Sequence, residues 1–271
     1  MPYTNFKPQV WTREIITELH KQLCFKSGSD FKYEGEVKKG NRVKILGIGS
    51  PTIKKYIQGK PIDPPEKLAD ASIYLDIDEI DYFNVGVDDI DNLQKKGLLT
   101  TFANEAAIKM SEKEDLYSAK KIALGSGNKL GKLKITTKEE AKTIINAMFT
   151  KIYKNNVSLK QKLQLYLTPE IYELMYDYIV ELKTNNDNTI VNGIVGTYKN
   201  ATVHMTNCIY NDGEYDHIVL KTPKSYAFAE GVNELIPFKP EGGFEEAIKA
   251  VYSFGGVVVK PKEIVTAEVS Y

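Results

Sequence analysis

Apolar and polar positions alternate most regularly between Ser72 and Val87. Apolar side chains occupy every second position of Ile73–Ile77, and Phe83–Val87 resumes the same alternation. A period of two is typical of a strand with one buried face. The acidic residues Glu79 and Asp81 interrupt the pattern, so we expect a bulge or bend between two strand pieces.

A helical period replaces this alternation in Asp91–Leu124, where apolar residues recur along one stripe. The segment would run roughly 50 Å as a helix, with a break expected near Gly97 and an end at Gly125. Further helices are predicted at Lys138–Tyr153 and at Glu170–Leu182. The second of these follows a Thr-Pro pair that suits a helix start.

The rest of the C-terminal half predicts short strands joined by turns. The expected strands are Leu163–Leu167, one or two strands within Ile194–Tyr210, Ile218–Lys221 and Glu263–Val269. The Asn-Asp-Gly sequence at 211–213 predicts a turn. Tyr226–Asn233 is compatible with a short helix or a strand, and the pattern of Phe244–Tyr252 predicts a helix.

The first 71 residues lack the apolar content of a self-contained core. Residues 1–10 predict an extended arm, and Trp11–Cys24 predicts a short amphipathic helix. The strand-like Arg42–Ile48 and many Gly and Pro residues then predict a long two-stranded excursion. Since an isolated hairpin is only marginally stable in water, this excursion is either a mobile loop or an arm that rests on another surface.

Equal numbers of basic and acidic residues, 36 of each in 271, conceal a strong segregation of charge along the chain. Residues 1–60 carry 12 basic and 5 acidic residues, whereas residues 61–125 carry 7 basic and 14 acidic residues. Two interpretations follow. The two segments pair within one compact chain, or the basic segment of one subunit lies on the acidic segment of the next, where charge sets partner choice.

Composition narrows the class of protein further. With 42% hydrophobic residues the chain can bury a sizeable core. The two cysteines, Cys24 and Cys208, exclude a disulfide scaffold and a cysteine-based zinc site. We see no secretory signal and no apolar run of the roughly 20 residues that span a bilayer, so we expect a soluble intracellular protein without a membrane partner.

Sequence motifs for chemistry were tested in turn. Gly125–Lys132 is rich in glycine, but it lacks the spacing of a phosphate-binding loop and follows a helix. The acidic runs at residues 76–81 and 88–91 lack the spacing of a calcium loop, and we interpret them as solvated faces. His204 and His217 could meet on adjacent strands but have no third ligand. We therefore predict no catalytic, cofactor or metal site, and no enzyme activity.

The order of several motifs resembles that of tailed-bacteriophage major capsid proteins of the Hong Kong 97-type coat fold. In chain order, the motifs resemble five parts of that fold. They are the N-terminal arm with its short helix, the start of the extended loop, the strand that returns from the loop into the long spine helix, the strand-to-helix turn of the axial domain, and the closing strand. In this sequence they are Pro8–Cys24, Tyr33–Ile45, Asp81–Gln94, Leu167–Leu174 and Phe254–Pro261.

The resemblance implies an α+β fold with five consecutive segments. They are an N-terminal arm and short helix (1–32), an extended loop (33–71), a peripheral domain with the spine helix (72–135), an axial domain (136–247) and peripheral C-terminal strands (248–271). Such subunits form pentamers and hexamers of an icosahedral, DNA-filled shell. The resemblance further implies assembly in the bacterial cytoplasm, with portal and scaffolding proteins as partners and non-specific contact with the packaged DNA.

Combined with the charge segregation, the resemblance predicts inter-subunit contacts of two kinds. The first is the apolar face of the N-terminal helix, and the second is a set of basic loop residues that meet acidic residues of a neighbour. The candidates are Trp11, Ile15 and Leu19 on the helix, Arg42, Lys44, Lys54 and Lys55 on the loop, and the acidic Asp76, Asp78, Asp88, Asp89 and Asp91.

Two alternatives stay open from sequence. A bacterial encapsulin shares the same architecture but encloses an enzyme cargo, and the neighbouring genes would distinguish it from a phage coat. A metal-dependent α/β enzyme that uses the acidic runs belongs to another class, and metal analysis of the purified protein would test for it.

Overall fold

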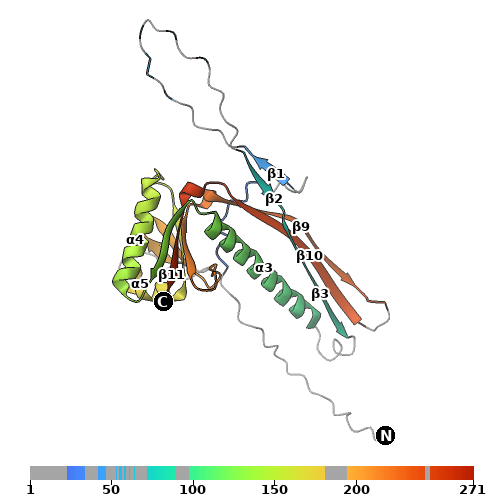
Figure 1. Cartoon of the computed structure of the whole chain (residues 1–271). Helices are drawn as coiled ribbons and strands as arrows, with labels where there is room; N and C mark the ends of the chain where they lie inside the picture. Colours follow the sequence, from blue (N-terminus) through green and yellow to red (C-terminus); the bar gives the residue numbers. More distant parts are fainter. Residues whose placement is uncertain are drawn as a thin grey trace.

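The structure is a computed structural model of the chain. It describes residues 23–33, 42–46, 72–88, 98–180, 194–241 and 245–271, with isolated positions between 53 and 64. Figure 1 shows two parts of different shape. In one, two helices cover a six-stranded sheet, and in the other a long helix lies along a three-stranded sheet. The combination of helices and mostly antiparallel strands agrees with the predicted α+β class.

The six-stranded sheet has the strand order β4-β11-β8-β5-β7-β6. Its β5–β7 and β4–β11 pairs are parallel and the others antiparallel. The strands are β4 (Asn128–Lys134), β5 (Leu163–Leu167), β6 (Ile194–Tyr198), β7 (Ala201–Met205), β8 (Asp216–Lys221) and β11 (Ile264–Ser270). Strands are thus found at each of the four places where the pattern predicted them.

Two helices, α4 (Lys138–Lys154) and α5 (Pro169–Val180), contact each other and this sheet. A capping box begins α4, because the Thr137 hydroxyl accepts the N–H of Glu140 and the Glu140 carboxylate accepts the N–H of Thr137. Six apolar residues of α4 are buried at helical spacing. The helix therefore forms where its period predicted it, with one face in the main core.

The three-stranded sheet has the order β3-β10-β9 and lies beside α3 (Leu98–Gly125). Its strands are β3 (Glu79–Asp88), β9 (Tyr226–Phe238) and β10 (Glu245–Val258). Both pairs are antiparallel, and the β10–β9 register shifts between Tyr252 and Phe254. The predicted end of the long helix at Gly125 is confirmed.

The prediction of a helix at Phe244–Tyr252 is wrong, because Glu245–Val258 is the central strand of this sheet. The Glu-Glu-Ala-Ile-Lys-Ala sequence has good intrinsic helix formers, which explains the error. Backbone pairing with a strand on each side and burial of Ala250 and Phe254 outweigh that local preference.

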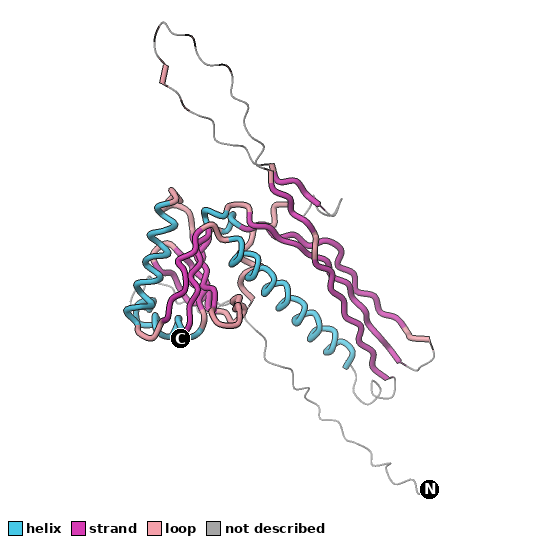
Figure 2. Tube along the Cα trace, in the orientation of Figure 1, coloured by secondary structure: helices cyan, strands magenta, loops and turns pink. Residues whose placement is uncertain are grey.

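A two-stranded ribbon of β1 (Arg42–Ile45) and β2 (Ile73–Asp76) projects from the elongated part (Figure 2). Val43, Ile45 and Leu75 on its inner face are buried against Ala227 and Ala229 of β9. The base of the ribbon is thus held by packing. The predicted division into two strand pieces is confirmed, but the break falls at Ile77 and Asp78, and the acidic Glu79 and Asp81 lie within β3.

Each of the two larger sheets contains strands from more than one of the five predicted segments. The three-stranded sheet takes β9 from residues assigned to the axial domain, whereas the six-stranded sheet takes β4 and β11 from residues assigned to the peripheral domain. The division into five segments remains a prediction.

A strap that anchors the N-terminal residues

Residues 23–33, here called the strap, lead from the N-terminal residues into the body of the protein. The strap makes side-chain or backbone contacts with α3, with β9 and with the six-stranded sheet. Sequence analysis assigned these residues to an arm and short helix and did not predict the contacts. Each partner lies 80 residues or more away along the chain.

Asp115 of α3 holds the first turn of the strap. Its carboxylate accepts the backbone N–H of Cys24 at 3.0 Å and that of Lys26 at 2.7 Å. Burial raises the pKa of Asp115 above its ordinary value, although the backbone donors oppose this shift. A buried carboxylate thus replaces water as the partner of the strap backbone.

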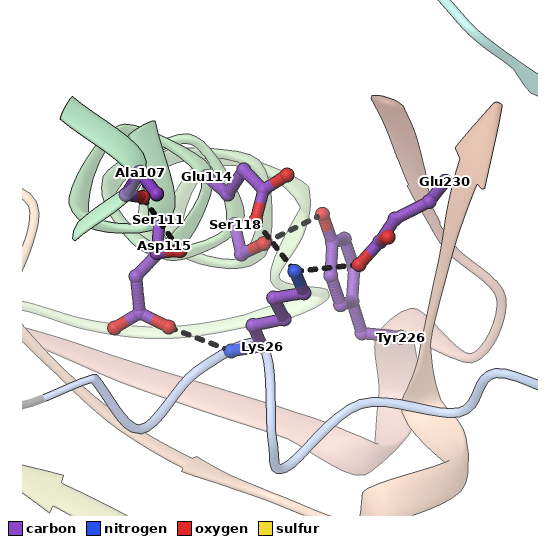
Figure 3. A network of polar contacts seen from close by, with 8 residues as sticks. All are labelled: Lys26, Ala107, Ser111, Glu114, Asp115, Ser118, Tyr226 and Glu230. Atoms are coloured by element: carbon purple, nitrogen blue, oxygen red, sulfur yellow. Dashed lines mark hydrogen bonds and ion pairs between the residues drawn. The ribbon is translucent and has the colours of Figure 1, made fainter. Parts of the chain in front are cut away.

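The ammonium of Lys26 joins two further elements, as Figure 3 shows. It lies 2.6 Å from a carboxylate oxygen of Glu114 on α3 and 2.5 Å from one of Glu230 on β9. Burial alone would lower the pKa of Lys26, but the hydrogen bonds to both carboxylates raise it. Burial likewise raises the pKa of Glu114, against the opposing effect of Lys26. Lys26 therefore links the helix to the sheet beside it.

The other side of the strap lies against the six-stranded sheet. The Phe25 ring stacks on Tyr166 of β5, with ring centroids 4.1 Å apart. The fully buried Lys221 of β8 donates to the carbonyl oxygen of Gly28 at 2.5 Å and to Oε1 of Gln164 at 2.9 Å. A Cβ at Gly28 would lie 2.1 Å from the Tyr166 hydroxyl, so this approach requires glycine.

A short parallel bridge completes the anchor. Asp30 donates its N–H to the carbonyl of Tyr226 at 2.9 Å and accepts the N–H of Phe228 at 3.1 Å. Tyr226 also bonds Ser118 of α3 through its hydroxyl, at 3.4 Å (Figure 3). The strap is thus fixed to α3, to β9 and to strands β5 and β8 of the six-stranded sheet.

The structure gives three of the predicted contact residues partners within the same chain. Arg42 and Asp76 face each other across the ribbon, with Nε–Oδ1 and Nη2–Oδ2 distances of 2.5 and 3.0 Å. Asp78 accepts hydrogen bonds from Tyr117 at 2.5 Å and from Lys121 at 2.9 Å. These three residues are therefore paired with residues of their own chain. Their role between subunits stays a prediction.

The remaining candidates divide by position. Lys44 and Lys55 are exposed, and Asp88 ends β3. Six candidates lie outside the described residues, namely Trp11, Ile15, Leu19, Lys54, Asp89 and Asp91. Of the candidates that the structure describes, Arg42 and Asp76 contact each other.

Sequence analysis also missed an exposed apolar face on the three-stranded sheet. Ile80 and Tyr82 of β3 and Ile236 of β9 are 69%, 80% and 44% exposed. Tyr82 and Ile236 also line a shallow pocket of about 300 Å³. Phe83 and Ala250, on the opposite face, are more buried. The alternation of Ile80 and Tyr82 with Asp81 and Phe83 was the signal, because it places apolar side chains on both faces.

The motifs tested for chemistry serve as structural elements. Gly127 packs against Pro261, where a Cβ would lie 2.8 Å from the carbonyl oxygen, so the glycine-rich stretch is a tight connection between α3 and β4. His204 on β7 and His217 on β8 do not lie on adjacent strands, because β5 separates them. Among the described residues no group of three His, Cys, Asp or Glu side chains is placed to hold a metal ion.

Within the same residues, no helix is long and apolar enough to cross a membrane. No protein-family model matches the chain, and no curated protein matches it in sequence. Comparison with known proteins therefore depends on structure.

Solved structures of phage particles match almost the whole chain. A chain of Mycobacterium phage Che8 has a TM-score of 0.80 and 22% identity, over 98% of both chains. Chains of the capsid of Cyanophage P-SCSP1u and of the mature capsid of bacteriophage PhiM1 each have a TM-score of 0.73, with 11% and 13% identity. Both matches cover 98% of this chain and 93% of theirs. The predicted Hong Kong 97-type coat fold is therefore confirmed.

Proposed function

We propose that this chain is the major coat protein of a bacteriophage head. Copies of it would assemble into pentamers and hexamers of an icosahedral shell that encloses double-stranded DNA. The observation that carries the proposal is the match of 97–98% of the chain to chains from phage structures, most of them named as capsids. A structural role needs no catalytic centre.

Two features of the isolated chain support this role. The ribbon of β1 and β2 projects beyond the sheets. Tyr74 on β2 and Leu46, which directly follows β1, are exposed. The three-stranded sheet leaves Ile80 and Tyr82 exposed on the face away from its core. Exposed apolar surface of this kind is typical of proteins that bury it against a partner. In a shell the partner would be another copy of the chain.

Pairs of opposite charge between subunits would determine which surfaces associate, in addition to the apolar contacts. The exposed Lys44 and Lys55, together with Lys54, would face acidic residues of the next subunit. Opposite charges at such a boundary guide association more than they add affinity. Portal and scaffolding proteins would be further partners, and contact with the packaged DNA would be non-specific, because basic and acidic residues are equal in number. The shell would assemble in the cytoplasm of the host bacterium.

Native mass spectrometry of the full chain, expressed alone and with the scaffolding protein of the same phage, tests the proposal. We expect rings of five and six copies of the 30.5 kDa chain, alongside larger assemblies. A chain that stays monomeric at every concentration, with or without the scaffolding protein, would contradict a coat function.

A further inference from the structure

The two cysteines of the chain lie in the same apolar core. Cys24 belongs to the strap, Cys208 lies in the connection between β7 and β8, and 184 positions separate them in sequence. Both thiols are reduced and fully buried, in the core to which α3, α4 and the six-stranded sheet contribute. The fold therefore brings together the two side chains of this sequence that are able to form a disulfide.

The side chain of Thr206 connects the two cysteines. Its hydroxyl oxygen accepts the backbone N–H of Cys208 at 3.0 Å, and the same side chain forms a hydrogen bond with the thiol of Cys24. Thr206 is itself held at the end of β5, because its N–H donates to the carbonyl oxygen of Leu167 at 3.1 Å. Both cysteines therefore contact one side chain, at a place that the six-stranded sheet fixes.

The backbone of Cys24 is held from two other directions. Asp115 accepts its N–H at 3.0 Å, and the Tyr166 hydroxyl donates to its carbonyl oxygen at 3.4 Å. Burial, followed by the charge of Asp115 and the proximity of Cys208, raises the pKa of the Cys24 thiol to about 12. The two thiols are thus close enough to interact, and both stay protonated and protected from reagents while the chain is folded.

We propose that Cys24 and Cys208 are a redox pair, which forms a disulfide within the chain by exchange with a small-molecule disulfide. One cysteine thiolate attacks that disulfide and displaces its first thiol, and the second cysteine then attacks the mixed disulfide and displaces the other thiol. One S–S bond forms in the protein, one is reduced in the small molecule, and the two cysteine protons end on the released thiols. The inference concerns the single chain and does not depend on the proposed coat function.

This disulfide would stabilise the folded chain. It joins residues that are far apart in sequence, so it removes much of the conformational freedom of the unfolded chain. It would also fix the strap covalently to the connection that follows β7. A reducing compartment keeps such a pair as thiols, whereas an oxidising environment favours the disulfide. A chain made in a reducing compartment would therefore gain this link only after it leaves.

Refolding of the full chain in a glutathione redox buffer tests the pairing, because the thiols are accessible until the core closes. The fraction of chain with a Cys24–Cys208 disulfide, measured by peptide mass at several ratios of reduced to oxidised glutathione, gives the effective concentration of one thiol at the other. We expect this value to be roughly 100-fold higher in native buffer than in strong urea, because the fold holds the thiols together. Equal values in the two solvents, or disulfides between chains in place of the internal one, would overturn the proposal.

Thermal unfolding of the oxidised and reduced chains measures what the disulfide does to the fold. We expect oxidation to raise the thermal midpoint by roughly 5 °C or more. The variant with both Cys24→Ser and Cys208→Ser is the matched control, because the same redox buffers should leave its midpoint unchanged. A lower midpoint after oxidation of the wild type would show that the native positions do not suit a disulfide, and would overturn the proposal. An equal rise in the wild type and the double variant would overturn it as well.

Discussion

The side-chain nitrogen of Lys221 donates a hydrogen bond of 2.5 Å to the backbone carbonyl of Gly28, 193 residues away in sequence. Lys221 is fully buried, and its second acceptor is Gln164. Burial lowers the pKa of Lys221 to about 7, although Asp115 opposes the shift. A neutral amine still has two N–H groups for these two acceptors, so the contact tolerates loss of the proton.

This pKa predicts how stability depends on pH. The unfolded chain keeps Lys221 protonated up to its ordinary pKa of 10.5, whereas the folded chain loses the proton near pH 7. Between these values the unfolded state binds more protons, so stability rises with pH. We expect the free energy of unfolding of the wild type to rise between pH 7 and pH 9 by about 2 kcal/mol more than that of Lys221→Met. Parallel pH profiles from urea unfolding would contradict the assignment.

A second pH dependence is expected from His204, on the acid side. The ring stacks on Tyr166, and neither ring nitrogen has a hydrogen-bond partner among the described residues. Burial, with a contribution from Lys221, lowers the pKa of His204 to about 4. Since the unfolded histidine takes up its proton near pH 6.5, stability falls as pH drops through this window.

His204→Phe keeps the stacked ring and removes the titration. We expect the wild type to lose about 2 kcal/mol more than this variant between pH 7.5 and pH 5. Urea unfolding at the two pH values measures the difference. A variant that loses as much stability as the wild type would show that the pKa of His204 is not lowered by folding.

Gly255 of β10 should not tolerate a side chain. A Cβ at this position would lie 1.9 Å from the carbonyl oxygen of Asp76, which is a backbone atom at the end of β2. We expect Gly255→Ala to destabilise the protein by about 3 kcal/mol, because β2 must move off the sheet. Gly86→Ala in the same sheet is the control, since its nearest neighbour is the flexible Glu245 carboxylate at 3.3 Å. Equal thermal midpoints for the two variants would contradict this prediction.

Removal of residues 1–22 should separate assembly from folding. The deletion leaves the whole strap, so we expect circular dichroism and the thermal midpoint to match those of the full chain. Because the predicted apolar helix face of Trp11, Ile15 and Leu19 is lost, we expect the truncated chain to form no closed shells. Normal shells in electron micrographs would refute an inter-subunit role for these residues. Deletion of residues 1–28 removes Cys24 and Lys26, and we expect it to destabilise the fold itself.

Reversal of charge at Lys54 and Lys55 tests electrostatic pairing between subunits. We expect the double substitution to Glu to slow assembly, as followed by light scattering, while the subunit stays folded. Wild-type assembly should also weaken with salt, since screening shortens the field to about 3 Å at 1 M. Unchanged assembly yield and unchanged salt response in the double variant would mean that packing or backbone pairing holds the loop.

The spacing of apolar residues predicted those helices and strands whose conformation depends mainly on their own residues. The period of Lys138–Tyr153 sufficed because that helix buries one face against the main core. The short apolar run Leu163–Leu167 sufficed because this strand is buried on both faces. Glu245–Val258 failed because pairing with β3 and β9 determines its conformation. The resemblance of motif order predicted the overall fold where no single motif was specific.

The strap could not be predicted from sequence for a different reason. Asp115, Tyr166 and Lys221 appear unremarkable in their own helix and strands, and each meets the strap only through the tertiary fold. Charge segregation placed Arg42 in the basic set and Asp76 in the acidic set, which were expected to meet between subunits. It could not tell pairing within one chain from pairing across a boundary, and the structure contains the first.

Electron cryo-microscopy of particles purified from cells that express this chain, with its scaffolding protein, tests the central claim most directly. The account predicts closed icosahedral shells whose five- and six-fold rings are built from this chain, with the β1–β2 ribbon of each copy lying on its neighbour. Monomers or small open oligomers as the sole species, at every salt concentration, would contradict it.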